Sequence, residues 1–348
     1  MRICLVGPAY PYRGGISQYS AMLARELSTA HDVLLVNFSR LYPDFLFPGR
    51  TQFDDGSSVL AVDTLRLIDS IQPFSWRRAA NAVCDFRPDI VVFQWWHPFF
   101  APAYRSMCAR IHGRTAARIV YVCHNVLPHE SSPVDRALTR LAFAGADAFV
   151  VQSREDGQIL STLRPDAIAE FNPMPVFDLF SAREDSARTE AVRRELAIEG
   201  RIILFFGLIR AYKGLRTLLD AFALAKDELD ATLLVVGEFY EDRAPYDAAI
   251  RELGIGDRVR IVDRYVPDSD VPAYFRLADV VVLPYLSATQ SAIVQTAFSF
   301  ERPVIVTAVG GLPDVVKDGV TGFVVPPQNP RALADAMLRF YREQAGPG

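Results

Sequence analysis

Two cations stand on a short, glycine-flanked segment in the second half of the chain. The apolar run that ends at Phe206 is followed by Gly207, Arg210, Lys213 and Gly214, and an amphipathic stretch begins after them. The fork of an arginine and the point charge of a lysine can together neutralise a diphosphate. Two solvated surface cations would give the same residues. The position of the loop between a strand pattern and a helix pattern favours a phosphate site.

Small polar residues follow another apolar run, Val280–Leu283. They are Ser287, Thr289 and Ser291, and the segment Ala292–Phe300 behind them has a helical pattern. The free N–H groups at a helix start can bind a phosphate or a sugar oxygen. The alternative is that one of these hydroxyls caps the helix and has no further role.

Paired glycines lie near the N-terminus. The first apolar run ends at Gly7, and Gly14 and Gly15 come shortly before a helical pattern that starts at Ser17. Paired glycines let backbone amides approach a ligand, and a helix N-terminus favours an anion. Because the spacing is not GxGxxG, we do not expect a dinucleotide. An ordinary turn between a strand and a helix is the alternative.

Aromatic residues follow the strand pattern Ile90–Gln94. Trp95, Trp96 and His97 begin this run, whose rings could stack on a sugar or on a lipid-linked acceptor. His97 could also serve as a base, and His129-Glu130 is expected nearby. Core packing between a sheet and a helix explains the same aromatic residues equally well.

Short apolar runs alternate with amphipathic stretches along the chain. This alternation predicts the strands and helices that place these residues at one edge of a sheet. Fully apolar strands indicate parallel sheets covered by helices on both faces. The alternation restarts near Ile202, after a proline-rich segment at Phe171–Phe177, so we expect two doubly wound α/β domains. Ligands in such folds bind at the carboxyl ends of the strands, where two such domains would form a cleft.

The predicted elements are as follows. Strands are expected at Ile3–Val6, Val33–Asn37, Ile90–Gln94, Ile119–Cys123, Ala148–Gln152, Ile202–Phe206, Thr232–Val236, Val259–Val262, Val280–Leu283, Pro303–Val306 and Gly322–Val325. Helices are expected at Ser17–Ser28, Trp76–Phe86, Ala103–His112, Asp135–Ala144, Leu215–Ala225, Tyr246–Leu253, Val271–Leu277, Ala292–Phe300 and Ala332–Arg342. The segment Leu41–Ser58 has weak periodicity and is expected to be a loop over the cleft.

Composition excludes several classes of protein. A chain of 348 residues suits about two domains, and its net charge of −4 offers no basic field to nucleic acid. The four scattered cysteines form no CxxC pair, so we expect buried, reduced thiols and neither a zinc site nor disulfides. No apolar run reaches the ~18 residues of a membrane span, and the N-terminal run is too short for a signal peptide. A cytoplasmic protein is expected, with peripheral contact at the inner face of the membrane left open.

Motifs of the second half occur in an order and spacing that resemble a known family. They are Arg210–Gly214, Val235–Glu238, Arg264–Pro267, Ala278–Pro284, Arg302–Ile305, Gly310–Val316 and Gly319–Pro326. This half resembles the donor domain of glycosyltransferase family 4, also called glycosyl transferase group 1, and the loop with Gly14 and Gly15 resembles its N-terminal half. The resemblance covers nearly the whole chain and implies the two-domain GT-B fold.

The family resemblance also implies an activity. It is the metal-independent, retaining transfer of a hexosyl group from a nucleotide sugar, most often UDP- or GDP-linked, to a glycan or lipid-linked acceptor in cell-envelope polysaccharide synthesis, with no cofactor. It implies an acceptor-side domain over residues 1–175 and a donor domain over residues 176–330. The last helix, within residues 331–348, would pack back on the N-terminal domain.

Site residues follow from the resemblance position by position. Lys213 and Arg210 would hold the donor diphosphate, although the family arginine usually stands where this chain has Leu208. His124 would face the sugar, and a hydrogen-bonded structural histidine is the alternative. The remaining donor residues would be Gly14, Gly15, Glu238, Tyr265, Val266, Thr289, Ser291, Gln295 and Thr296, with Tyr265 and Val266 meeting the base through backbone groups.

One departure from the family pattern concerns two glutamates that usually stand eight positions apart. Counting back from Pro303 places them at Ala288 and Thr296, and neither is a carboxylate here. Gln290 or Gln295 could replace some hydrogen bonds but not the charge, and we assign Gln290 to the catalytic group with His124. Two readings follow: an active glycosyltransferase, or a catalytically inactive GT-B protein that binds a nucleotide sugar or a partner enzyme. A sugar-nucleotide epimerase would need more carboxylates and histidines.

Overall fold

The chain forms two compact units. The computed structural model describes residues 1–43, 47, 49–54, 61–128, 131–178, 180–181 and 186–344. Unit 1 comprises Met1–Pro173 and unit 2 comprises Met174–Gly348, so the division falls two residues before the predicted boundary. His129 and Glu130, and part of the segment Leu41–Ser58, lie outside the described residues.

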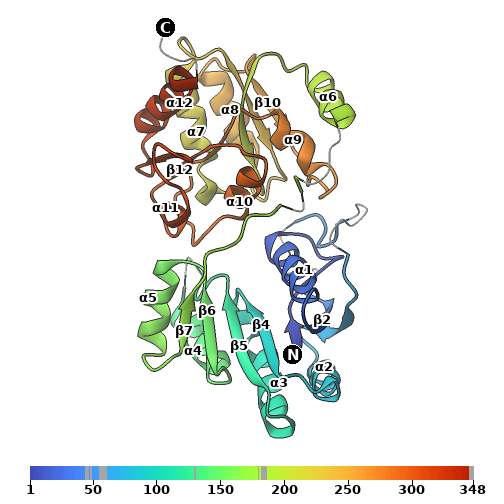
Figure 1. Cartoon of the computed structure of the whole chain (residues 1–348). Helices are drawn as coiled ribbons and strands as arrows, with labels where there is room; N and C mark the ends of the chain where they lie inside the picture. The colour runs from blue at the N-terminus through green and yellow to red at the C-terminus, as the bar shows by residue number, and fades with distance from the viewer. Residues whose placement is uncertain are drawn as a thin grey trace. The chain divides into compact units, whose positions relative to one another are not determined.

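Unit 1 is built around a parallel sheet (Figure 1). Its strands are β1 (Arg2–Val6), β2 (Asp32–Arg40), β3 (Leu65–Asp69), β4 (Ile90–Trp95), β5 (Arg118–Cys123), β6 (Ala148–Val151) and β7 (Ala169–Phe171). Its helices are α1 (Gly15–Leu27), α2 (Pro73–Phe86), the 3₁₀ turn η2 (Pro98–Phe100), α3 (Ala101–Arg114), α4 (Pro133–Phe143) and α5 (Arg154–Leu163). The strand order is β3-β2-β1-β4-β5-β6-β7.

Both faces of this sheet are covered because alternate side chains of each strand point to opposite sides. In β1, Ile3 and Leu5 pack with Ala24 of α1, while Cys4 and Val6 join the larger core beneath α2, α3 and α4. Helix α3 packs between α2 and α4. The period of two in strand burial therefore divides the apolar runs between two cores.

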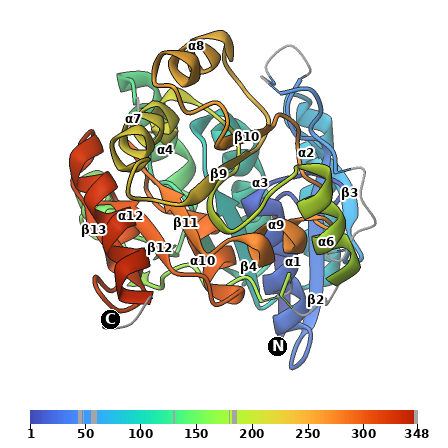
Figure 2. The same cartoon turned by 90° about the horizontal axis from the view of Figure 1, so that it is seen from above.

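Unit 2 repeats the same architecture (Figures 1 and 2). Its strands are β8 (Arg201–Phe206), β9 (Ala231–Val236), β10 (Val259–Val262), β11 (Val280–Leu283), β12 (Val304–Thr307) and β13 (Gly322–Val325). Its helices are α6 (Ser186–Glu195), the 3₁₀ turn η3 (Ala211–Lys213), α7 (Leu215–Ala225), α8 (Ala244–Glu252), α9 (Val271–Leu277), α10 (Ala292–Ser299), α11 (Leu312–Val315) and α12 (Pro330–Gln344). The parallel strand order is β10-β9-β8-β11-β12-β13.

The predicted fold class and most predicted elements are confirmed. Strands β10, β11 and β13 and helices α7 and α9 have the predicted bounds. The sequence pattern missed β3 and β7, which are edge strands with largely exposed side chains and so lack a continuous apolar run. It also missed α5 and the strongly polar α6. All four cysteines are buried, as expected.

Within the described residues, helix α12 packs against other elements of unit 2. It lies against α7, beside which Figure 1 draws it, and against β12 and β13. Leu333, Met337 and Phe340 supply the apolar stripe of α12 and join the core of unit 2. Packing of this helix on the N-terminal domain stays a prediction.

Candidate functional site

The strand order of unit 2 places two of the candidate loops side by side. Strands β8 and β11 are neighbours, and the chain continues from β8 to one side of the sheet and from β11 to the other. Such a point, where the winding direction reverses, is where ligands bind in doubly wound folds. We call the segment Gly207–Gly214 after β8 the cation loop and the segment Pro284–Ser291 after β11 the serine loop.

The cation loop is fixed by backbone hydrogen bonds rather than left mobile on the surface. Its last part forms η3, in which the N–H of Lys213 donates to the carbonyl of Arg210 at 2.9 Å. The N–H of Ala211 donates to the carboxylate of Glu241 at 2.7 Å. The N–H of Leu286 in the serine loop donates to the carbonyl of Tyr212 at 2.7 Å, which ties the two loops together.

Lys213 and Ser291 are brought together through a residue that lies between them. The ammonium of Lys213 donates to the hydroxyl of Tyr285 at 2.8 Å, and that hydroxyl lies 3.4 Å from the Oγ of Ser291. Burial acts to lower the pKa of Lys213, but the nearby hydroxyls of Tyr285 and Tyr212 outweigh it and the net shift is upward. Lys213 therefore carries its positive charge at neutral pH beside the start of α10.

Two glycines explain how the loops of unit 2 approach each other so closely. A Cβ on Gly214, whose φ is +71°, would lie 1.9 Å from the carbonyl oxygen of Pro284. A Cβ on Gly310, whose φ is +52°, would lie 1.5 Å from the carbonyl oxygen of Ala288. No side chain fits at either position, so glycine is required both by the space and by the left-handed backbone. The loops after β8, β11 and β12 therefore form one closely packed edge.

Arg210 and Glu238 lie on adjoining loops at the same edge. The N–H of Ile209 donates to the carbonyl of Glu238 at 2.9 Å, which continues the pairing of β8 with β9 into the loops. The guanidinium of Arg210 lies over the ring of Tyr240, 5.0 Å from its centroid. Glu238 is buried. The structure thus brings Arg210, Lys213 and Glu238 to neighbouring strand ends.

The serine loop leads directly into α10. Thr289 and Ser291 are buried, Gln290 is half-buried, and Ser291 immediately precedes the helix. The capping alternative does not apply to Ser291, because its side chain makes no capping hydrogen bond to α10 within the described chain. Its hydroxyl instead lies 3.4 Å from the Tyr285 hydroxyl.

The other predicted donor residues of unit 2 occupy two places. Gln295 and Thr296 are buried within α10, and the hydroxyl of Thr296 donates to the carbonyl of Ala292 at 2.9 Å. Tyr265 and Val266 follow β10, on the far side of β9 from the cation loop. Their backbone lies at the same carboxyl edge of the sheet, because the strands are parallel.

In unit 1 the paired glycines begin α1. The helix starts at Gly15, two residues before the predicted start, and Gly14 precedes it with a φ of +105°. A Cβ on Gly14 would meet nothing within 4 Å, so backbone conformation rather than space requires glycine there. The first amides of α1 therefore lie at the carboxyl edge of β1.

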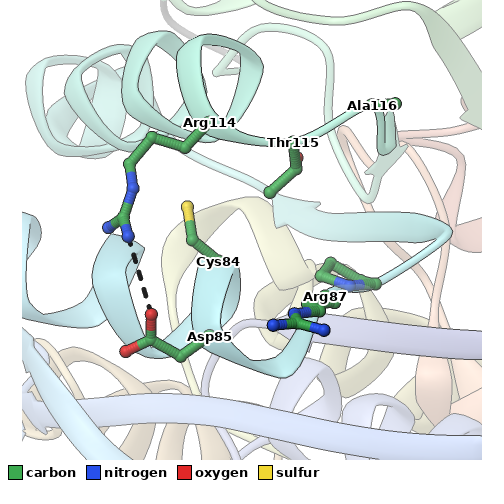
Figure 3. Close-up of a pocket in the computed structure, with 7 residues that line it drawn as sticks. Cys84, Asp85, Arg87, Arg114, Thr115 and Ala116 are labelled. Atoms are coloured by element: carbon green, nitrogen blue, oxygen red, sulfur yellow. Dashed lines mark ion pairs between the residues drawn. The ribbon is translucent and has the colours of Figure 1, made fainter.

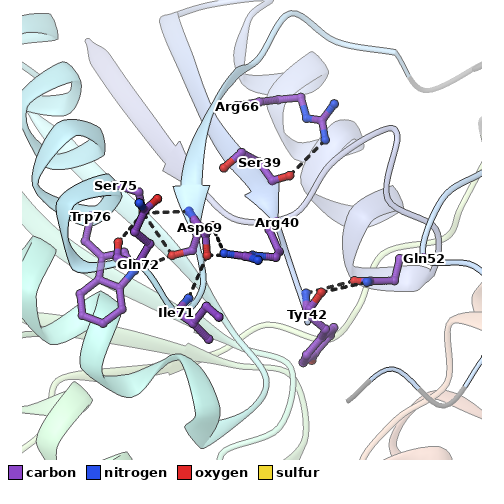
Figure 4. Close-up of polar contacts among 10 residues, drawn as sticks. All are labelled: Ser39, Arg40, Tyr42, Gln52, Arg66, Asp69, Ile71, Gln72, Ser75 and Trp76. Carbon is purple, nitrogen blue, oxygen red and sulfur yellow. Dashed lines mark hydrogen bonds and ion pairs between the residues drawn. The ribbon is translucent and has the colours of Figure 1, made fainter. Parts of the chain in front are cut away.

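The described residues among 41–54 pack against the loop that contains Gly14 and Gly15, which we call the glycine loop. The N–H of Arg13 donates to the carbonyl of Gln52 at 3.0 Å, and Tyr12 forms a bridge with Phe53. The amide of Gln52 pairs with the backbone of Tyr42 in both directions, as Figure 4 shows. Whether this segment lies over a ligand stays a prediction.

The neighbouring ends of β2 and β3 are joined by charge (Figure 4). Arg40 donates to the carboxylate of Asp69 from its Nε and its Nη2, and the carbonyl of Asp69 accepts from Ser75 and from the indole of Trp76. These contacts fix the start of α2 against the edge strand. These polar groups find their hydrogen-bond partners within this cluster. Its role at this edge of the sheet is therefore structural.

His124 follows β5 and is buried within unit 1. Its Nε2 lies 2.8 Å from the amide oxygen of Gln94 on β4, and since that oxygen can only accept, the imidazole donates. The ring of Tyr19 meets it edge to face at 4.9 Å between centroids. Burial lowers the pKa of His124 to about 4 against the opposing hydrogen bond to Gln152. His124 is therefore neutral at pH 7.

We expect this depressed pKa to make unit 1 less stable in acid. In the unfolded chain His124 titrates near its ordinary pKa, so between about pH 6.5 and 4 the unfolded state binds the extra proton and stability falls as pH falls. The loss attributable to His124 is about 2 kcal/mol between pH 7 and 4.5. His124→Gln should lack this part of the slope.

Tryptophan fluorescence during urea unfolding measures the effect on unit 1 alone, because Trp76, Trp95 and Trp96 are the three tryptophans and all lie there. Burial raises the pKa of Asp156 to about 6, which changes stability with the opposite sign in this range. Both proteins share that term, so their difference isolates His124. Equal losses of stability in parent and variant would contradict the buried, neutral histidine.

The prediction that Trp95 stacks on an acceptor is wrong. Its side chain is 0% exposed, its indole N–H donates to the carbonyl of Val126 at 3.2 Å, and its ring packs against Tyr104 and Phe143 in the core. A ring enclosed on all sides offers no face to a ligand. The core-packing alternative holds for this residue, because it is the last residue of a central strand.

Trp96 and His97 lie further out. The indole N–H of Trp96 donates to the hydroxyl of Tyr42 at 2.9 Å, and its ring packs on Phe100. His97 is exposed, and its Nδ1 accepts from the N–H of Phe99 at 3.1 Å at the start of η2. An acceptor role for these two residues stays a prediction.

A separate pocket of about 520 Å³ lies at the opposite end of the unit 1 strands (Figure 3). Its lining includes Arg87, just before β4, and Thr115, just before β5, together with the Arg114–Asp85 ion pair at 3.7 Å. Amino ends of parallel strands are not where doubly wound folds bind their ligands. We therefore place the candidate site at the carboxyl edges instead.

Sequence patterns gave no role to two residues that the structure places in the site. Tyr285 stands inside the serine loop but is neither small nor charged. Gln94 is a fully buried amide within an otherwise apolar strand, and that polar residue in an apolar run was the available signal.

Among the helices that the structure describes, none has the length and apolar character of a membrane span.

Two family models match the chain. The model described as Glycosyltransferase Family 4 matches residues 13–169, and the model described as Glycosyl transferases group 1 matches residues 200–343. They cover the two units in turn and include both the glycine loop and the cation loop.

Curated relatives match about half of the chain. A D-inositol 3-phosphate glycosyltransferase of Corynebacterium glutamicum is 34% identical over 203 residues, which are 55% of this chain and 48% of that protein. An alpha-D-kanosaminyltransferase of Streptomyces kanamyceticus is 29% identical over 165 residues, 47% of this chain and 42% of that protein. The matched region thus spans about half the length of these relatives.

Solved structures match nearly the whole chain in fold. Anabaena HepE, solved in complex with UDP, has a TM-score of 0.72 at 16% identity, covering 99% of this chain and 91% of that one. Sucrose-phosphate synthase from Thermosynechococcus elongatus has a TM-score of 0.73 at 19% identity, with coverage of 99% and 91%. At these identities the likeness is one of fold.

Proposed function

This chain belongs to glycosyltransferase family 4, the glycosyl transferases of group 1, and we propose that it transfers a sugar from a nucleotide sugar with retention of configuration. It has the GT-B fold of that group. The donor would bind unit 2, and a glycan or lipid-linked acceptor would bind unit 1. Cell-envelope polysaccharide synthesis is the proposed setting.

The observation that carries the proposal is the placement of Lys213. Its ammonium lies at the reversal point of the unit 2 sheet, 2.8 Å from the Tyr285 hydroxyl and beside the first residues of α10. A diphosphate there would meet a lysine charge, the guanidinium of Arg210 and the amides that begin a helix.

Charge stabilisation at this place suits the proposed reaction. The bond between the anomeric carbon and the diphosphate oxygen breaks while the acceptor hydroxyl attacks the same face of the sugar, and the departing diphosphate takes the hydroxyl proton. Negative charge develops on the diphosphate, and Lys213 and Arg210 would stabilise it in the transition state. The reaction as proposed needs no base from the protein.

A nucleotide screen tests the proposal. Anabaena HepE has been solved with UDP and with UDP-glucose, so uridine donors come first, followed by GDP-, ADP- and TDP-sugars. A ligand that binds only the folded protein raises its melting temperature, by about 2.7 kcal/mol of stability at a hundredfold excess over Kd. If none of these nucleotides shifts the melting temperature, the donor-binding proposal fails.

A second candidate function is an inactive GT-B protein that binds a nucleotide sugar or a partner enzyme. It is favoured by the residues at the positions of the family glutamates, since Ala288 and Thr296 carry no charge and the Thr296 hydroxyl already bonds within α10. Donor binding without any donor hydrolysis or transfer, across the full panel, would select this candidate.

Gln290 separates the two candidates. If neutral hydrogen bonds have replaced the first carboxylate, Gln290 can both donate to and accept from the donor sugar. Gln290→Ala should then lower turnover at least about tenfold, a loss of about 1.4 kcal/mol of transition-state stabilisation. Nucleotide affinity, measured by calorimetry, should change little because the cation loop is untouched. Unaltered turnover in the variant would remove Gln290 from the catalytic group.

A further inference from the structure

Tyr285 lies at the centre of the candidate diphosphate site. Its hydroxyl is 2.8 Å from the Nζ of Lys213 and 3.4 Å from the Oγ of Ser291, and its side chain is only 1% exposed. Because an ammonium has three donors and no acceptor, the tyrosine oxygen accepts from Lys213. The hydroxyl is thus an acceptor of fixed position inside the loop.

The peptide group that joins Tyr285 to Leu286 is held in place. Its carbonyl accepts from the hydroxyl of Thr307 on β12 at 2.5 Å, and the next N–H, that of Leu286, donates to the carbonyl of Tyr212. The ammonium of Lys213 also lies over the tyrosine ring, 4.1 Å from its centroid. The ring cannot turn away without breaking its contacts with Lys213 in the cation loop.

Lysine, by contrast, has a flexible four-carbon stem that must be ordered before its charge can act on a ligand. Ordering the stem in advance lowers the cost of binding. We propose that Tyr285 is a positioning residue that holds the ammonium of Lys213 beside the start of α10, so that a diphosphate meets a preorganised charge. The inference rests on the proposed function for the role of Lys213.

A ligand-free measurement tests the contact itself. The chain has three lysines, Lys213, Lys226 and Lys317, so a sample with ¹³Cε-labelled lysine gives a spectrum of three side-chain signals that single substitutions assign. Tyr285→Phe keeps the ring and removes the hydroxyl. It should move the Lys213 signal and lower the pKa at which that signal titrates, while the signals of Lys226 and Lys317 stay in place.

The matched control is Tyr212→Phe, because the Tyr212 ring is the other one beside the ammonium, at 5.6 Å from its centroid. It should shift the Lys213 signal by less than a third as much. A Lys213 signal that is unaltered in Tyr285→Phe, or that responds equally to both variants, overturns the inference.

A binding cycle tests the consequence, with UDP and GDP as the probes. Tyr285→Phe should weaken binding of the nucleotide that the parent binds about tenfold, but less than twofold in a protein that already carries Lys213→Ala. Equal losses in both backgrounds would mean that Tyr285 does not act through Lys213. If the parent binds neither UDP nor GDP, and none of the other nucleotides of the thermal screen, the proposed function fails. The lysine spectrum still decides the role of Tyr285.

Discussion

Lys213→Ala is expected to weaken nucleoside diphosphate binding about 30- to 150-fold, a loss of about 2–3 kcal/mol. The ammonium is fixed beside the start of α10 and remains charged at neutral pH. A diphosphate bound there would lose a charge-assisted hydrogen bond, which is about twice as strong as a neutral one. Isothermal calorimetry with the nucleotide found in the thermal screen measures the change.

Lys226→Ala is the matched control for this experiment. It removes one lysine charge from the same unit, but its ammonium bonds the carbonyl of Leu253 at 3.3 Å, behind the end of α7. Its nucleotide affinity should therefore stay within about twofold of the parent. Similar nucleotide affinities of Lys213→Ala and Lys226→Ala would refute the placement of the diphosphate at the cation loop.

Gly214→Ala is expected to destabilise unit 2 by about 3–5 kcal/mol and to abolish nucleotide binding. A Cβ at this position would lie 1.9 Å from the carbonyl oxygen of Pro284, so the cation loop must move away from the serine loop. That movement separates Lys213 from Tyr285 and breaks the hydrogen bond between Leu286 and Tyr212. The preorganised charge is lost together with the packing.

Gly200→Ala separates this steric effect from backbone strain. Gly200 has a φ of +66°, close to the +71° of Gly214, but a Cβ there would meet nothing within 4 Å. Gly200→Ala should lower the stability only by the cost of placing a side chain on a left-handed backbone, about 1–2 kcal/mol. It should leave nucleotide binding intact. Scanning calorimetry gives both stabilities. Comparable losses in the two variants would show that loop contact does not require glycine at 214.

Local pattern was sufficient to predict the elements and the cation loop. Apolar runs such as Val280–Leu283 are buried on both faces in a parallel sheet, so every residue of the strand is apolar and the run marks its bounds. Arg210, Lys213 and Gly214 were recognisable because glycines and cations between a strand and a helix form a contiguous signal. Edge strands such as β3 gave no such signal, since solvent replaces one set of neighbours.

Tertiary structure decided which of the predicted residues meet and which are core. Trp95 and Trp96 are adjacent in the sequence, yet alternation along β4 and the helices above it bury the first completely and leave the second half-buried. Tyr285 reaches Lys213, 72 residues away, only because β8 and β11 are neighbours in the sheet. Strand order is set by the packing of whole elements, so no local pattern in the sequence carries it. The sequence alone therefore determined the chemistry available at the carboxyl edges, and the sheet order determined which of those groups act together.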